Sequence, residues 1–226
     1  MESLDLLNKS IQLVGNIVIL CLLVNVFFSG YIFKTQGSPY RRLFLFLVFN
    51  LLIEIAARLL AFSGHNNLPL LHLYTLGEFL LLSWFYKSLV DQPKIFQSHY
   101  WYFVIGVSIM IVLNSLLFQS IYEFNTLAKT IVQIIIISYA VLFFYNLTEN
   151  RKLSSTTEKS LRLINSAVLI YYSGSLFIFM CGQISFENTD LYKVFWAFNA
   201  LLNFIFQLLV LYALWQVAFS KTPSSS

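Results

Sequence analysis

Seven long apolar runs follow one another along the 226-residue chain, separated by short polar connections. A helix that crosses a bilayer needs about 20 mostly apolar residues, and each run is about that long. Strands of a membrane barrel would instead alternate polar and apolar residues over about ten positions. The runs therefore predict seven spanning helices, over residues 11–33, 43–62, 70–90, 100–119, 126–147, 161–182 and 193–219.

Helix-breaking residues agree with this division. The four prolines, Pro39, Pro69, Pro93 and Pro223, are expected in the connections or the tail. No connection is long enough to fold by itself, and residues 220–226 are expected to form a short flexible tail. The predicted fold class is all-α: a polytopic membrane protein that forms a single seven-transmembrane-helix bundle.

Composition supports the membrane class. Hydrophobic residues make up 58% of the chain and charged residues 11%, against about 45–50% and 25% in soluble domains. So few charged residues cannot cover a soluble globule of this size. The net charge of +4 does not indicate nucleic-acid binding, because the basic residues lie in short connections between apolar runs. The expected surroundings are the lipid bilayer.

Basic residues are distributed unequally between the two sides of the predicted bundle. Ten lie in or beside the first, third and fifth connections or in the tail: Lys34, Arg41, Arg42, Lys87, Lys94, Arg151, Lys152, Lys159, Arg162 and Lys221. Four lie on the other side: Lys9, Arg58, Lys129 and Lys193. Because cytoplasmic loops carry the excess of Lys and Arg, the pattern predicts an N-out/C-in topology.

Charged side chains inside a spanning helix mark candidate sites, because each costs about 2.5–3.5 kcal/mol on insertion scales. The second run carries Asn50, Glu54 and Arg58 at steps of four, which places them on one helical face. Glu54 and Arg58 have the spacing of an intrahelical ion pair. Two interpretations stay open: a pair that neutralises itself and locks neighbouring helices, or part of a functional site.

The third run contains a second carboxylate, Glu78, about two turns inside the predicted membrane region. Tyr74 lies one turn before it on the same face, whereas His72 lies about 240° around the helix and close to the outer boundary. His72 and Glu78 therefore cannot both point at one ion from a single ideal helix. Since its own helix supplies no nearby cation, Glu78 must pair with Arg58 or Lys129, or hold a proton.

Two further polar stripes complete the pattern. The fifth run opens with Lys129 and Gln133, and the seventh carries Asn199, Asn203 and Gln207 at steps of four. With the predicted topology, the polar stripes of all four runs fall between the outer surface and mid-membrane, above inner halves that are almost purely apolar. This asymmetry predicts a polar pocket that opens outward above an apolar plug; the alternative is a buried network that only specifies packing. The candidate pocket residues are Glu54, Arg58, His72, Tyr74, Glu78, Lys129, Gln133, Asn199 and Asn203.

The segment from Pro69 to Lys87, PLLHLYTLGEFLLLSWFYK, resembles a segment of uncharacterised multi-span membrane proteins of Bacteroidetes. The likeness centres on the third run and its His-x-Tyr-Thr-x-x-Glu-Phe core, and the rest of the chain matches only in outline. No established activity comes with those proteins. The resemblance implies a multi-pass protein of a bacterial inner membrane.

Neither a metal nor a cofactor is expected. Cys21 and Cys181 show no metal-ligand spacing. A retinal pigment needs a lysine within the seventh span, where Lys193 only opens the run. The seven-helix zinc hydrolases related to adiponectin receptors use a histidine of the last helix, and the last run contains none.

Three function classes remain open. The first is a ligand-binding or sensory subunit, in which a small polar ligand or a proton enters the pocket and a membrane or cytoplasmic protein partner responds to helix movement. The second is a small-solute or proton-coupled transporter that uses Glu54 and Glu78. The third is an intramembrane enzyme in which Glu78 and His72 act as acid and base. The first is favoured because the runs are unbroken and carry no recognisable nucleophile or metal motif.

Reporter fusions to the C-terminus test the predicted topology. Because the basic residues place this end in the cytoplasm, a fused green fluorescent protein should fluoresce and a fused alkaline phosphatase should be inactive. An active phosphatase together with a dark fluorescent fusion would reverse the orientation.

Overall fold

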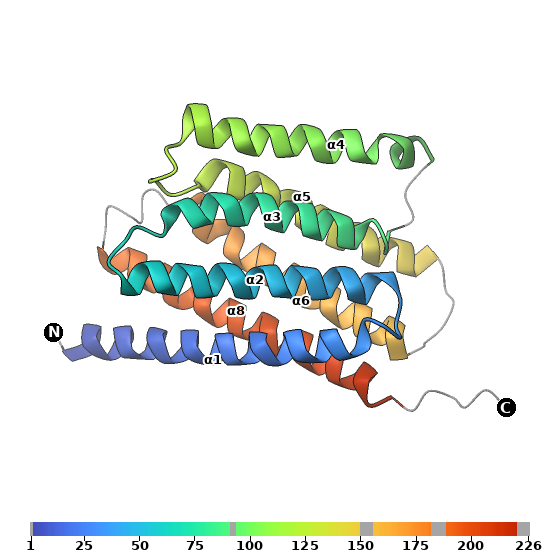
Figure 1. Ribbon diagram of the computed structural model, residues 1–226, viewed down its shortest axis with the longest axis horizontal. Helices are drawn as coiled ribbons and strands as arrows, with labels where there is room; N and C mark the ends of the chain where they lie inside the picture. The colour runs from blue at the N-terminus through green and yellow to red at the C-terminus, as the bar shows by residue number, and fades with distance from the viewer. Residues whose placement is uncertain (1, 91–93, 150–155, 182–188, 221–226) are drawn as a thin grey trace.

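The computed structural model describes residues 2–90, 94–149, 156–181 and 189–220, and the regular structure in these ranges is helical (Figure 1). Seven helices in this part of the chain are long and apolar enough to cross a membrane. They are α1 Glu2–Ile32, α2 Ser38–Phe62, α3 Leu68–Tyr86, α4 Lys94–Leu113, α5 Thr126–Glu149, α6 Thr156–Met180 and α8 Thr189–Ala218. The predicted class, an all-α seven-helix membrane bundle, is confirmed.

The helix boundaries differ from the apolar runs where local chemistry, not hydropathy, sets them. Pro39 and Pro69, expected in connections, lie in the first turns of α2 and α3. The N–H of a residue in the first turn has no acceptor within the helix, so proline, which lacks an N–H, is favoured there. After α4 the chain continues into a π-helical turn, Asn114–Phe118, that hydropathy does not reveal. Apart from Ser220, the predicted tail lies outside the described residues.

The helices stand in two layers (Figure 1). One layer holds α1, α2, α3 and α4 in this order, and the other holds α8, α6 and α5. Contacts of α1 with α8 and of α3 with α5 join the layers into a ring, and α4 packs on the outside of α3. The ring gives the bundle an interior that several helices face at once.

The exterior of this bundle is apolar, whereas part of the interior is polar. Leu20 and Phe27, for example, are 61% and 71% exposed, while Glu78, Lys129 and Gln133 are fully buried. In water such an arrangement would be unfavourable. In a bilayer, lipid covers the apolar exterior and polar groups must find partners inside the protein. The distribution is that of an integral membrane protein.

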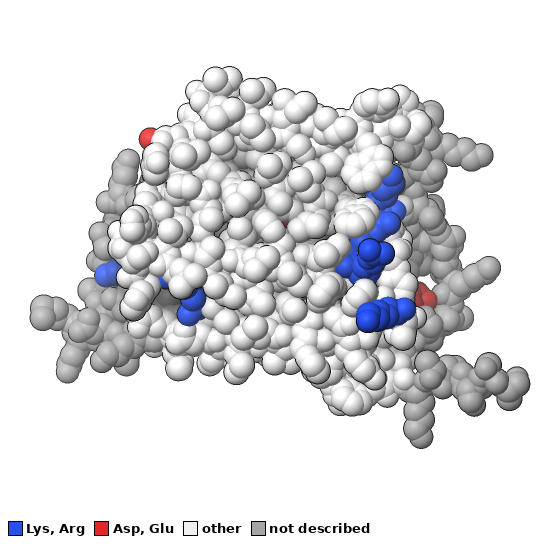
Figure 2. All heavy atoms as spheres, viewed as in Figure 1, with Lys and Arg blue, Asp and Glu red and all other residues white. Residues whose placement is uncertain are grey.

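The two ends of the bundle differ in charge. We call the end with residues 33–37 and 87–90 the odd-loop end, and the end with residues 63–67 and 119–125 the even-loop end. Figure 2 shows Lys and Arg side chains gathered mainly at the odd-loop end, over the start of α2 and the end of α3, beside a broad uncharged band. There Arg42 donates a hydrogen bond to the carbonyl of Trp84 and lies over its ring. Basic and aromatic side chains together are typical of a membrane interface.

Close packing of α2 on α3 depends on Gly77. A Cβ at this position would lie 2.2 Å from the ring of Phe49, and that ring is itself stacked on Tyr74, with the centroids 6.2 Å apart. We expect G77A to destabilise the bundle by about 1–3 kcal/mol, as overpacking does. The control is G106A in α4, because a Cβ at Gly106 meets nothing within 4 Å and an alanine favours the helix. Equal melting temperatures of the two variants in detergent would contradict this packing.

Candidate functional site

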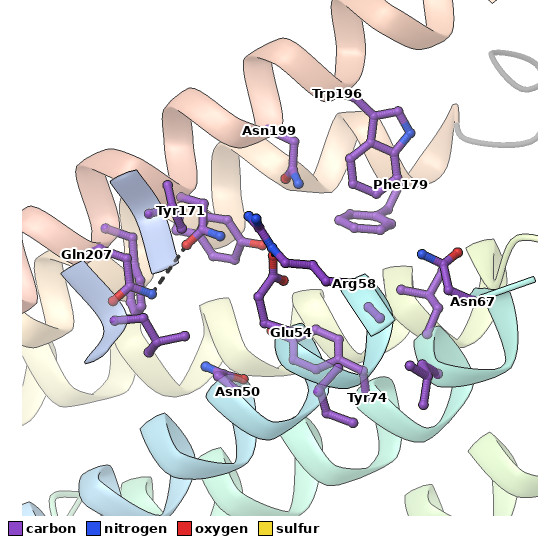
Figure 3. Close-up of a pocket in the computed structure, with 18 of the residues that line it drawn as sticks. Asn50, Glu54, Arg58, Asn67, Tyr74, Tyr171, Phe179, Trp196, Asn199 and Gln207 are labelled. Atoms are coloured by element: carbon purple, nitrogen blue, oxygen red, sulfur yellow. Dashed lines mark hydrogen bonds and ion pairs between the residues drawn. The ribbon is translucent and has the colours of Figure 1, made fainter. Parts of the chain in front are cut away.

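A cavity of about 440 Å³ lies inside the ring, in the half of the bundle next to the even-loop end (Figure 3). Helices α1, α2, α3, α6 and α8 supply its walls. Ala61 and Asn67, which are both exposed, line its mouth, and the lining reaches Phe46 and Gln207 towards the middle of the bundle. A cavity of this size is large enough for a small molecule.

Glu54 and Arg58 face this cavity from α2. The predicted ion pair is present, with 3.4 Å between Arg58 Nε and Glu54 Oε1 and with both side chains 43% exposed. The closer contacts of Arg58 go to α1: Nη1 donates to Asn16 Oδ1 at 2.7 Å, and Nη2 donates to the carbonyl of Gly15 at 2.8 Å. Arg58 therefore ties α2 to α1, and its contact with Glu54 is the weaker one.

Amide side chains of α8 form the opposite wall. Asn199 is 8% exposed, and no described residue is a hydrogen-bond partner of its Oδ1. Its amide points into the cavity (Figure 3). One turn further, Asn203 accepts a hydrogen bond from Gln207 at 3.4 Å, and Gln207 Oε1 accepts one from Asn25 of α1 at 2.7 Å. The α8 wall is thus satisfied near the middle of the bundle and unsatisfied at Asn199.

Aromatic side chains complete the lining, and sequence reasoning missed all but one of them. They are Phe46, Tyr74, Tyr171, Tyr172, Phe179, Trp196 and Phe206, together with Phe124 from the connection before α5. Neutral aromatic residues are abundant in this chain, so they carry no signal comparable to a charge in an apolar run. The adjacent tyrosines of the sixth run were the one available hint.

A buried ion pair lies behind this aromatic wall. Lys129 of α5 donates to Glu78 of α3, and both side chains are fully buried. Tyr172 of α6 donates to the other carboxylate oxygen at 2.7 Å, and the ammonium lies 4.4 Å from the centre of the Tyr74 ring. Of the two cations considered for Glu78, Lys129 is therefore the partner and Arg58 is not. Lys129 does not extend to the interface.

The two remaining candidate residues, His72 and Gln133, each lie in a separate hydrogen-bonded cluster. His72 faces the π-helical turn after α4 and the connection before α5, where its ring nitrogens contact Ser115 Oγ at 2.7 Å and the carbonyl of Glu123 at 3.2 Å. Gln133 of α5 donates to Ser175 of α6 at 2.8 Å.

The structure thus brings Glu54, Arg58, Tyr74, Asn199 and Asn203 together at the cavity. His72, Glu78, Lys129 and Gln133 lie outside the cavity lining, so the candidate residues are divided between the cavity and separate clusters. The reason is that α3 has different neighbours on its different faces, namely α2, α4 and α5. Residues at one depth therefore meet different helices.

The region between the cavity and the odd-loop end is less apolar than expected. Tyr86 donates to Asn165 at 2.7 Å, and Asn165 donates to the carbonyl of Ala140 at 3.0 Å. Tyr100 donates to the carbonyl of Ser83 at 2.6 Å. These groups are buried and paired locally, so the plug below the cavity is a packed core with internal hydrogen bonds.

Fold and cavity together define the class: an integral membrane protein with a seven-helix bundle and an interior cavity near one end. No protein-family model, curated protein or solved structure matches the chain. Among the described residues, no group of three or more His, Cys, Asp and Glu side chains is placed to hold a metal ion.

The Glu78–Lys129 pair can be tested by double substitution. K129M leaves a fully buried carboxylate without its cation, so we expect a loss of about 3–5 kcal/mol in the free energy of unfolding. The double variant E78Q/K129M removes both charges and should recover most of this loss.

The matched control is the exposed pair of Glu158 and Arg162 at i, i+4 in α6. R162M should cost less than about 1 kcal/mol, because solvent screens an exposed pair. Melting in detergent measures all three variants. A double variant no more stable than K129M would show that the buried charges do not compensate each other.

Proposed function

We propose that the protein is a membrane-embedded binding or sensory subunit that admits a small ligand to the cavity from the even-loop end. The observation that carries the proposal is the incompletely satisfied polar lining. The buried Oδ1 of Asn199 has no partner among the described residues, and the carboxylate of Glu54 is loosely paired. Polar groups at membrane depth need partners. A ligand with hydrogen-bonding groups supplies them.

A carrier is less well supported. The cavity lining ends at Phe46 and Gln207, and beyond them Leu43 and Val210 are buried in a packed core. A carrier needs polar access to both sides of the membrane in turn. The acid–base enzyme is also less well supported, because His72 and Glu78 lie in separate hydrogen-bonded clusters.

The wall of the cavity offers a route from ligand binding to helix movement. Tyr74 and Tyr172 contact the cavity on one side and the buried Glu78–Lys129 pair on the other. A ligand that displaces these rings therefore shifts the link between α3, α5 and α6. We propose that a membrane or cytoplasmic protein partner responds to this shift, and that the even-loop end faces outward in a bacterial inner membrane.

A cavity-filling substitution tests the binding function. Ala57 lines the cavity, whereas its neighbour Ala56 does not. A57F should block the cavity, and A56F is the matched control. Melting temperatures are measured in detergent with a panel of amines, carboxylic acids, amino acids and polyols, since a ligand at 100 times its Kd stabilises by about 2.7 kcal/mol.

We expect at least one compound to raise the melting temperature of the wild type and of A56F but not of A57F. If no compound stabilises the wild type, or if A57F responds equally, the cavity is not a binding site.

A further inference from the structure

The carboxylate of Glu54 retains unused capacity to accept hydrogen bonds. An ionised carboxylate has about four acceptor sites. Within the described part of the chain its hydrogen-bond contact is the 3.4 Å approach of Arg58 Nε, at the long limit for a hydrogen bond. The side chain is 43% exposed and lines the cavity. The space beside Glu54 therefore fits a group rich in N–H donors, such as an ammonium.

The guanidinium of Arg58 retains unused donors in the same place. It has five N–H groups, of which three point to Glu54, Asn16 and Gly15. The remaining two belong to Nη1 and Nη2 and have no partner among the described residues. Because two N–H groups of one guanidinium match the oxygens of a carboxylate or a phosphate, Arg58 can hold an acid group while it stays bound to α1.

Charge balance decides between the possible ligands. Glu54 cancels Arg58, and the neighbouring Glu78 cancels Lys129, so the described charges around the cavity sum to zero. A ligand that is only an amine would add an uncompensated positive charge at membrane depth, and one that is only an acid would add a negative charge. A molecule that carries both groups adds none.

The rest of the lining suits an apolar body attached to these two groups. Figure 3 shows Tyr74, Tyr171 and Trp196 around the space beside the Glu54–Arg58 pair. Tyr74 is already stacked on Phe49 and lies against the Lys129 ammonium, so it contributes its ring edge. The rings of Tyr171 and Trp196 offer apolar surface, and the faces of tyrosine and tryptophan also attract an ammonium. Asn199 provides one more acceptor, its unpartnered Oδ1.

We infer that the cavity recognises a zwitterion, with the ammonium against Glu54, the acid group against Arg58 and an apolar body against the aromatic wall. Two sources share this chemistry: a free amino acid with a large apolar side chain, and the headgroup of phosphatidylethanolamine. The inference rests on the proposed binding function and adds the class of ligand.

Three probes with the same phenyl body test the charge requirement on the full-length wild-type protein. L-Phenylalanine carries both charges, 2-phenylethylamine carries only the ammonium, and 3-phenylpropionate carries only the carboxylate. Binding to the purified protein in detergent is measured by titration calorimetry and by the shift in melting temperature. We expect phenylalanine to bind at least tenfold more tightly than either singly charged probe. This comparison uses no variant, so it does not depend on whether a mutant folds.

A separate comparison tests whether the zwitterion is a lipid headgroup. Short-chain phosphatidylethanolamine and phosphatidylglycerol, below their micellar concentrations, are compared in the same assays. Tighter binding of phosphatidylethanolamine without binding of phenylalanine would assign the zwitterion to a lipid headgroup, and the reverse would assign it to a free amino acid. If a singly charged probe matches phenylalanine, and phosphatidylglycerol matches phosphatidylethanolamine, the inference is overturned.

Substitutions then assign the two halves of the site. E54Q and R58Q should each weaken binding of the preferred zwitterion at least tenfold, while R162Q, on the exposed pair of α6, should leave it unchanged. Unchanged binding to a folded E54Q protein would place the ammonium elsewhere and overturn the assignment. If a neutral polyol stabilises the wild type and A56F but not A57F while no zwitterion binds, the proposed function stands and this inference fails.

Discussion

Inside a bilayer no water solvates a charge, so each ionised side chain must meet its partner within the protein. In this bundle the requirement is met most completely by Glu78 and Lys129, which come from α3 and α5 and take a third partner, Tyr172, from α6. Removal of either charge would leave the other uncompensated. The relative positions of three helices therefore depend on this one contact, and the aromatic wall of the cavity is built directly on it.

The same requirement is left partly unmet at the cavity, as it is at a few other buried polar atoms of the described residues, such as Ser83 Oγ and Gln133 Oε1. Arg58 is held by two short hydrogen bonds to α1, but Glu54 makes one long contact and Asn199 Oδ1 has no described partner. Buried polar groups without partners are costly, and in native proteins they often mark functional positions. Under the proposed function, a small molecule in the cavity supplies the missing hydrogen bonds.

Several side chains combine a structural role with the binding role proposed above. Arg58 holds α2 against α1 through two short hydrogen bonds and still presents free donors to the cavity. Tyr74 and Tyr172 line the cavity and also contact the buried ion pair. Such double contacts couple the contents of the cavity to the packing of the bundle. A sensory subunit requires such coupling. A ligand can shift the equilibrium between two conformations of a protein only if it interacts differently with each of them.

The sequence by itself determined the features that depend on one segment. Seven apolar runs specified seven helices, because a spanning helix satisfies its own backbone and needs only length and hydropathy. The pair of Glu54 and Arg58 also followed from local spacing, because both residues share one helix. Tertiary structure alone decided which faces meet. It selected Lys129 over Arg58 for Glu78, and it turned His72 towards the π-helical turn after α4 instead of the cavity. These choices depend on the rotation and order of the helices in the ring, and neither hydropathy nor the spacing within a single helix encodes them.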